Sequence, residues 1–448
     1  MEKFIEKNYK KIILIICILG ILVRTIYVTI NPIRKNQYDC KIWELYELED
    51  YEEAYKMNEK KIGKAGHMYY IFTIYNTMKL PDGAGGQYYH PPLHHFTSAM
   101  WLKIMDILPL NAVQKIESLQ VLSLIYSIII LILIYKIIEE TKIKELGKIL
   151  ILILINFYPL FIYMSGFVNN DLLITLFMIL NLYYIIKWNE DFNIKNTLIL
   201  AFSFGLGMMT KTSMAVMMLP LAYVVVVKFI DKIKEKDKKS MKKIIIQAII
   251  FIIIAGTLSL WFQIRNLVKY DFEILGIQKP YEHFYSGDAS IWERWGFVSK
   301  DILKNGIKIE DKNIYSSVIN SGLYCLYTMT STASYIIKEI AVILSIISFF
   351  AVIIIFINKI VKKEIKDNIF ILLITFFACI IGFISFNISL PYSCTMNSRY
   401  IGMLYIISMI MLGKSMSESK YKLWKYLILV LSIILSIFSV VVVFGKPL

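Results

Sequence analysis

The sequence predicts an all-α integral membrane protein, with about eleven transmembrane helices and interfacial helices in large outer loops. Three observations predict this class. Of 448 residues, 57% are hydrophobic and only 19% are charged, which is more apolar surface than a soluble protein of this size can bury. The apolar residues fall in long runs, and short lysine-rich clusters separate many of these runs.

Most of the apolar runs have the length that a helix needs to cross a membrane, and two of them are short. At 1.5 Å per residue, about 20 residues cross a hydrocarbon core about 30 Å thick. The first run lacks a small-residue cleavage site, so we expect it to remain as an anchor. The predicted spans are 12–30, 117–136, 147–165, 171–187, 197–209, 213–229, 244–262, 335–357, 369–388, 400–413 and 424–444.

Basic residues collect beside alternate runs and predict the orientation. Clusters lie before the first run, near 228–243, near 358–368 and near 414–425. Loops rich in lysine and arginine stay in the cytoplasm, which places the N-terminus inside. Because these clusters account for much of the net charge of +15, nucleic acid is not an expected partner.

This topology divides the chain into five parts. They are an N-terminal anchor span (1–30), a first outer loop with interfacial helices (31–116), transmembrane helices two to seven (117–262), a large outer loop (263–334) and the C-terminal transmembrane helices (335–448).

The first outer loop is expected to hold two interfacial helices. The first is amphipathic, because its apolar residues recur every three or four positions, at Ile42, Leu45, Leu48, Tyr51 and Tyr55. It should lie flat on the membrane surface. The second is a short helix that should follow His90, because proline fits the first turn of a helix and Pro91 and Pro92 stand there.

Two aspartates are candidates for acid–base chemistry. Asp39 lies between the first span and the amphipathic helix, where a carboxylate can act as general base toward an acceptor hydroxyl. The alternative is a solvated surface aspartate. Asp171 ends the sequence GFVNND at the head of the fourth span. There Asn170 or Asp171 can equally serve as a helix cap, and the two roles are compatible.

Three cations are expected at the outer face of the membrane. They are Lys211 in TKTS, Arg265 beyond the seventh span and Arg399 in NSRY. A phosphate leaving group needs such charges, because negative charge grows on its bridging oxygen as a glycosidic bond breaks. The alternative for each is snorkelling to lipid headgroups. Arg24 lies within the first span, so it must reach the interface or pair inside the bundle.

Histidines and aromatic residues surround the proline pair. His90 and His94 have helix-like spacing, but Pro91 and Pro92 place His90 ahead of the helix and no acidic partner is fixed nearby. We therefore expect no metal site. Tyr88, His90 and Asn170 are instead candidates for lining an acceptor cleft.

The order of these residues resembles that of a known family. Arg24 and Asp39 are followed by YYHPPL at 88–93, NND at 169–171, TKTS and finally SRY. This set resembles the polytopic glycosyltransferases of the GT-C fold, especially the protein O-mannosyltransferase and lipid A aminoarabinose transferase family. The resemblance is good as far as Tyr270, and beyond it rests on topology, the large outer loop and SRY.

The resemblance implies transfer of a sugar from a polyprenyl-phosphate donor to a hydroxyl of a glycan, lipid or protein acceptor, without cofactor or metal. By that likeness Asp39 matches the catalytic carboxylate and Asp171 the second acidic position. Arg265 matches a phosphate-contacting arginine by position, with Lys211 and Arg399 as further donors to the phosphate. The reaction would be inverting and would take place on the outer face.

One departure from the family pattern concerns the acceptor. Protein mannosyltransferases commonly show an Asp-Glu pair where Asp39 is followed by Cys40, which argues against protein O-mannosylation. No soluble lumenal domain is visible, which favours a multi-pass enzyme of a bacterial plasma membrane, in contact with membrane lipids.

Two other functions remain open. A transporter or flippase of lipid-linked sugar would share the topology, but its charges should lie at the membrane midplane. A membrane scaffold that binds partners through the outer loop would make the combination of Asp39, HPPL and NND a coincidence.

Overall fold

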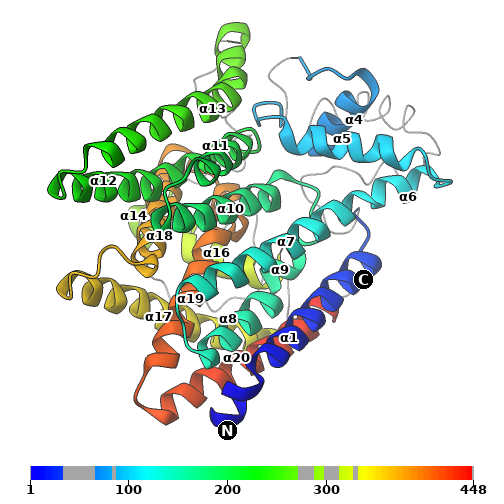
Figure 1. Cartoon of the computed structure of the whole chain (residues 1–448). Coiled ribbons are helices and arrows are strands. Elements are labelled where there is room, and N and C mark those ends of the chain that lie inside the picture. Colours follow the sequence, from blue (N-terminus) through cyan, green and yellow to red (C-terminus); the bar gives the residue numbers. More distant parts are fainter. Residues whose placement is uncertain are drawn as a thin grey trace. The chain divides into compact units, whose positions relative to one another are not determined.

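The structure is a computed structural model that describes residues 2–33, 66–82, 87–270, 287–296, 312–325 and 331–445. Every regular element in these ranges is a helix (Figure 1). Several of these helices are long and apolar enough to cross a membrane. The prediction of an all-α, multi-pass membrane protein is therefore confirmed.

Within the described ranges, nine helices are long and apolar enough to be membrane spans, and they match nine of the predicted segments. The remaining two segments form shorter helices. Residues 147–165 are divided into α8 (Glu145–Phe157) and α9 (Pro159–Met164), because Tyr158 precedes a proline and takes an extended conformation. The segment 197–209 lies mostly in α11 (Ile194–Met208), which has only 15 residues.

The chain forms two compact units. The first unit comprises Met1–Arg24, Leu131–Tyr163 and Lys279–Leu448. It contains most of α1 (Glu2–Ile30), the end of α7 (Leu119–Glu140), α8, most of α9, α14 (Ile291–Trp295), α16 (Ile314–Tyr324), α17 (Thr332–Val361), α18 (Asn368–Ser389), the short helices η3 (Ser393–Met396) and η4 (Ser398–Ile401), α19 (Gly402–Glu418) and α20 (Lys422–Phe444).

Close backbone contact joins α8 and α19 in the first unit. A Cβ on Gly147 would lie 2.6 Å from the carbonyl oxygen of Gly413, and a Cβ on Gly413 would lie 2.8 Å from that of Gly147. Only glycine leaves room for such an approach, which is how small residues bring membrane helices together. Helix α19 also packs against α17, which in turn packs against α20.

Arg24 is fully buried in the first unit and pairs inside the bundle. Its Nη1 donates to the carbonyl oxygens of Gly20 (3.0 Å) and Asn156 (2.9 Å), and its Nη2 donates to that of Ile155 (3.0 Å). Two of these carbonyls belong to the last turn of α8, where backbone acceptors lack partners within the helix and the helix dipole is negative. Arg24 therefore stabilises the end of α8 just before Pro159, where the helix is interrupted.

The second unit comprises Thr25–Ile130 and Met164–Gln278. Helix α11 packs against α10 and α13, and α4 packs against α5. The unit contains the end of α1, α4 (Gly66–Thr77), α5 (Leu93–Met105), α6 (Ala112–Glu117), the start of α7, α10 (Asn170–Glu190), α11, η1 (Thr212–Met217), α12 (Met218–Lys234) and α13 (Lys238–Tyr270).

Three local expectations differ from the structure of the second unit. The helix after His90 is confirmed as α5, but it begins at Leu93, with Pro92 as its N-cap and neither proline in its first turn. Helix α4 was not predicted. Residue 263 was expected to begin the large outer loop, but α13 continues to Tyr270. The amphipathic helix expected over 42–55 lies outside the described residues.

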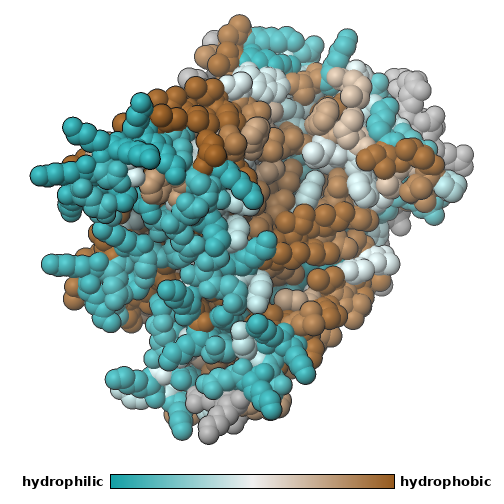
Figure 2. Space-filling model, in the orientation of Figure 1, coloured by the Kyte–Doolittle hydropathy of each residue, from teal (hydrophilic) through white to brown (hydrophobic). Residues whose placement is uncertain are grey.

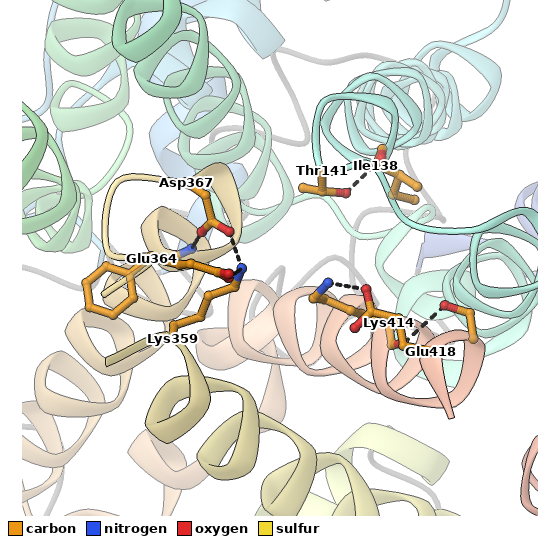
Figure 3. A network of polar contacts seen from close by, with 9 residues as sticks. Ile138, Thr141, Lys359, Glu364, Asp367, Lys414 and Glu418 are labelled. Atoms are coloured by element: carbon orange, nitrogen blue, oxygen red, sulfur yellow. Dashed lines mark hydrogen bonds and ion pairs between the residues drawn. The ribbon is translucent and has the colours of Figure 1, made fainter. Parts of the chain in front are cut away.

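The lysine-rich turns form polar ends of the helices. Figure 2 shows hydrophilic surface at the turn between α12 and α13. In the first unit, the turn between α17 and α18 contains the polar network of Figure 3, in which Lys359 pairs with Glu364 (2.6 Å) and Asp367. On the neighbouring α19, Lys414 pairs with Glu418. Because these lysines pair with acids of their own helix or turn, the network stabilises the turns. The charges drawn in it do not converge on a common binding site.

Candidate functional site

Three of the sequence motifs meet in the second unit. The amide of Leu93, in HPPL, donates to the carbonyl of Met209 (2.9 Å). The side-chain amide of Asn170, in NND, donates to the carbonyl of Thr210 (3.4 Å), the first residue of TKTS. The turn after α11 is thereby bonded to the first residues of both α5 and α10.

An ion pair joins the last two of these motifs. Asp171 lies in the first turn of α10, where the positive end of the helix dipole stabilises a carboxylate, and it pairs with the ammonium of Lys211. Their side chains are only 4% and 13% exposed. Removing two charges from water costs free energy that their attraction only partly offsets. The pair therefore adds little net stability, and its main effect is to fix the positions of the two charged groups.

The helix cap is neither of the two expected residues. Asn169 is the N-cap of α10, and its Oδ1 accepts the amide of Asp171 (3.0 Å). The prediction that Asn170 or Asp171 caps the helix is wrong, because Asn170 already has helical backbone geometry and stands one position inside. The two side chains are consequently directed to the turn after α11.

A cluster of four histidines lies beside this ion pair, and three of them, His67, His94 and His95, are buried. Nδ1 of His67, on α4, lies 2.9 Å from Nε2 of His95, on α5, so one ring donates a hydrogen bond to the other. The His67 ring also lies 5.7 Å from that of His90 and 6.1 Å from that of His94. We did not foresee the part of His67, because it depends on how α4 packs on α5.

Burial keeps two of these rings uncharged. The pKa of His94 is lowered to about 3, mainly by burial and also by His67, while the carboxylate of Asp171 opposes the shift. The pKa of His95 is also lowered by burial and by its histidine neighbours. In the part of the chain that the structure describes, no group of three or more His, Cys, Asp or Glu side chains has the geometry of a metal site. The absence of a metal stays a prediction.

Two tyrosines continue the cluster toward α13. The ring of Tyr70 stacks on His95 at 3.9 Å, and that of Tyr88 lies edge-on to Tyr70 at 5.8 Å. Tyr88 is buried in an aromatic core with Tyr69 and Phe72. Burial raises the pKa of Tyr70, and the guanidinium of Arg265 offsets part of this rise. Arg265 is therefore within electrostatic reach of Tyr70, whose ring stacks on His95.

Arg265 lies near the C-terminal end of α13. Its Nη1 donates to Oδ1 of Asn266 (2.9 Å), and its Nη2 lies 3.5 Å from the carbonyl of Pro81 and 3.7 Å from Oδ1 of Asp82. Its side chain is 22% exposed. Arg265 thus lies against the segment that leads into YYHPPL.

The other two predicted residues lie elsewhere. Arg399 belongs to the first unit, where its Nη2 donates to the hydroxyl of Tyr400 (3.0 Å) and its guanidinium lies 5.0 Å from that ring. Asp39 lies outside the described residues, so its part as a general base stays a prediction. Six of the predicted residues belong to the second unit, namely Tyr88, His90, Asn170, Asp171, Lys211 and Arg265.

A comparison with known protein families covers part of this set. Residues 89–261 match the model of a family described as dolichyl-phosphate-mannose-protein mannosyltransferases. The resemblance to GT-C glycosyltransferases is confirmed. The matched range contains His90, Asn170, Asp171 and Lys211, and the match supports a membrane glycosyltransferase of the mannosyltransferase type. No curated protein matches the chain.

Proposed function

We propose that the protein transfers a sugar from a polyprenyl-phosphate donor to an acceptor hydroxyl on the outer face of a bacterial plasma membrane. The observation that carries the proposal is the meeting of HPPL, NND and TKTS in one unit, within the range that resembles mannosyltransferases. Separately, each motif has a plain structural explanation. Together they place a carboxylate, an ammonium group and a histidine cluster side by side.

The proposed reaction is a single displacement at the anomeric carbon. Asp39 takes the proton of the acceptor hydroxyl while that oxygen attacks, which is general base catalysis. The bond between the anomeric carbon and the phosphate oxygen breaks, and its electron pair leaves with the polyprenyl phosphate. Attack opposite the leaving group inverts the configuration of the sugar.

Cations stabilise the departing phosphate in this proposal. Negative charge grows on the bridging oxygen, and positive groups already in place lower the barrier. Arg265 is the first candidate because guanidinium suits phosphate geometry and its side chain is partly exposed. Lys211 and Arg399 are weaker candidates, and Lys211 is already engaged by Asp171.

Asp171 has a positioning part in this account. Its pairing with Lys211 fixes both side chains between α10 and the turn after α11. It would orient Asp39, the acceptor or the sugar through that arrangement. Tyr88 and His90 would line the acceptor cleft, and Asn170 holds the turn after α11 through Thr210.

A transporter or flippase of lipid-linked sugar is the alternative. One observation favours it: the break between α8 and α9 lies beside the buried Arg24, and transporters build their sites at broken helices. The contacts of Arg24 with three backbone carbonyls agree better with a structural part.

The proposal is tested by transfer with purified protein. The full chain is incubated with undecaprenyl-phosphate mannose and an envelope extract, and release of undecaprenyl phosphate is measured. Asp39→Asn should abolish release, because removal of an essential base cannot be compensated by binding. Thermal unfolding should match that of the unchanged protein, which shows that the variant is folded. Full activity of Asp39→Asn would show that Asp39 is not the general base.

A further inference from the structure

Two hydrogen-bond donors and one guanidinium converge on one carboxylate oxygen at the end of α13. The hydroxyl of Tyr270 lies 2.8 Å, Nζ of Lys269 2.5 Å and Nη2 of Arg265 3.7 Å from Oδ1 of Asp82. Arg265 also donates to the hydroxyl of Tyr270 (3.4 Å), and its guanidinium lies 5.4 Å from that ring. These three side chains form one cradle around a single oxygen atom, with hydrogen bonds from Lys269 and Tyr270 and an ion pair from Arg265.

The charge of this cradle exceeds that of its occupant. Among the residues that the structure describes here, two cations surround one carboxylate, which leaves one positive charge in excess. The hydrogen bonds from Lys269 and Tyr270 lower the pKa of Asp82, which keeps it ionised. A cation near the C-terminus of a helix also balances the dipole, but this does not explain why an aspartate and a tyrosine hydroxyl meet there.

Asp82 is an occupant that can be displaced. Its side chain is 76% exposed, and that of Lys269 is 50% exposed. Ion pairs in such positions are weak, because water screens them and the side chains lose freedom. A second anion with more oxygens and more charge can therefore replace the carboxylate.

We propose that Arg265, Lys269 and Tyr270 form a binding site for the phosphate of the lipid-linked substrate and product, with Asp82 as an internal competitor. The inference rests on the proposed function and adds Lys269, Tyr270 and Asp82 to it. A sugar–phosphate diester carries one negative charge, whereas the phosphomonoester that leaves carries between about 1.5 and 2 at neutral pH. The cradle thus gains most from the leaving group, and the return of Asp82 promotes its release.

Binding of a short analogue tests the inference without turnover. Farnesyl phosphate is titrated into the purified full chain in detergent, and the dissociation constant is measured by calorimetry. Asp82→Asn should tighten binding by about two- to five-fold, because a weak competitor is removed. Lys269→Gln and Tyr270→Phe should weaken it by about the same factor or more. Asp82→Asn combined with Lys269→Gln should lose the gain.

A matched control uses another exposed ion pair. Glu235→Gln breaks the pair of Lys232 and Glu235 after α12 and should leave farnesyl phosphate binding unchanged. Inorganic phosphate and phosphatidylglycerol are titrated in parallel. Binding of farnesyl phosphate that far exceeds both, with the variant pattern above, supports the inference. An equal response to phosphatidylglycerol would make the cradle a lipid headgroup site and overturn it.

The inference and the proposed function can fail separately. Unchanged binding in Asp82→Asn, with transfer still dependent on Asp39, would overturn the competitor and leave the glycosyltransferase proposal standing. Thermal unfolding of each variant shows whether a lost affinity reflects a lost fold. Because Asp82→Asn is expected to gain affinity, misfolding cannot imitate its result.

Discussion

The buried ion pair of Asp171 and Lys211 gives the sharpest structural prediction. Asp171→Asn leaves the Lys211 ammonium almost buried without its carboxylate, and Lys211→Met does the converse. Loss of one partner of a buried pair costs about 3 to 5 kcal/mol. Since Lys211 is 13% exposed and Asp171 only 4%, water relieves the lone lysine more easily. We therefore expect about 3 kcal/mol for Asp171→Asn and a larger loss for Lys211→Met.

The double variant separates charge pairing from packing. Asp171→Asn with Lys211→Met removes both charges, so its loss of stability should be smaller than the sum of the single losses by at least about 1 kcal/mol. The assay is equilibrium unfolding in mixed detergent micelles, followed by circular dichroism. As a control, Lys232→Met removes an exposed partner and should have little effect. Additive single losses, or losses no larger than that of the control, would refute the description of a coupled buried pair.

Two further predictions concern stability. Because His94 has a folded pKa of about 3 against about 6.5 when unfolded, only the unfolded chain takes up its proton between these values. The free energy of unfolding should therefore fall as pH drops below about 6.5, by about 2 kcal/mol at pH 5. In unfolding measured across pH, His94→Gln should reduce this dependence of stability on pH. An unchanged dependence would contradict the lowered pKa of His94. Gly20→Ala should destabilise the protein by about 1 to 3 kcal/mol, because its Cβ would lie 1.9 Å from Oδ1 of Asn156. Gly256→Ala, whose Cβ would have no atom within 4 Å, should stabilise it. Equal melting temperatures for the two variants would contradict the close contact at Gly20.

The fold followed from the sequence where the pattern was long. Apolar runs of membrane length, separated by lysine clusters, have few other structures available. Prediction failed where a local or tertiary feature decided the outcome. Pro159 divides a run that otherwise has the length of a span, and α4 is too short and too apolar throughout to show either membrane length or an amphipathic stripe.

The site was predictable in its motifs and not in its contacts. HPPL, NND and TKTS could be recognised as segments, but which of the consecutive residues Asn169 and Asn170 caps α10 depends on the backbone at that turn. His67 carries no local signal, because its partner His95 is 28 positions away. Asp82 likewise meets Lys269 only through packing of distant segments.

The fate of the donor lipid tests the central claim most directly. Purified protein in proteoliposomes is given radiolabelled undecaprenyl-phosphate mannose together with an envelope extract, and the lipid and sugar products are separated by chromatography. A glycosyltransferase should release undecaprenyl phosphate and move the label to the acceptor in equal amounts. Label that crosses the bilayer while still attached to its lipid, with no release of undecaprenyl phosphate, would contradict the enzyme and favour a flippase.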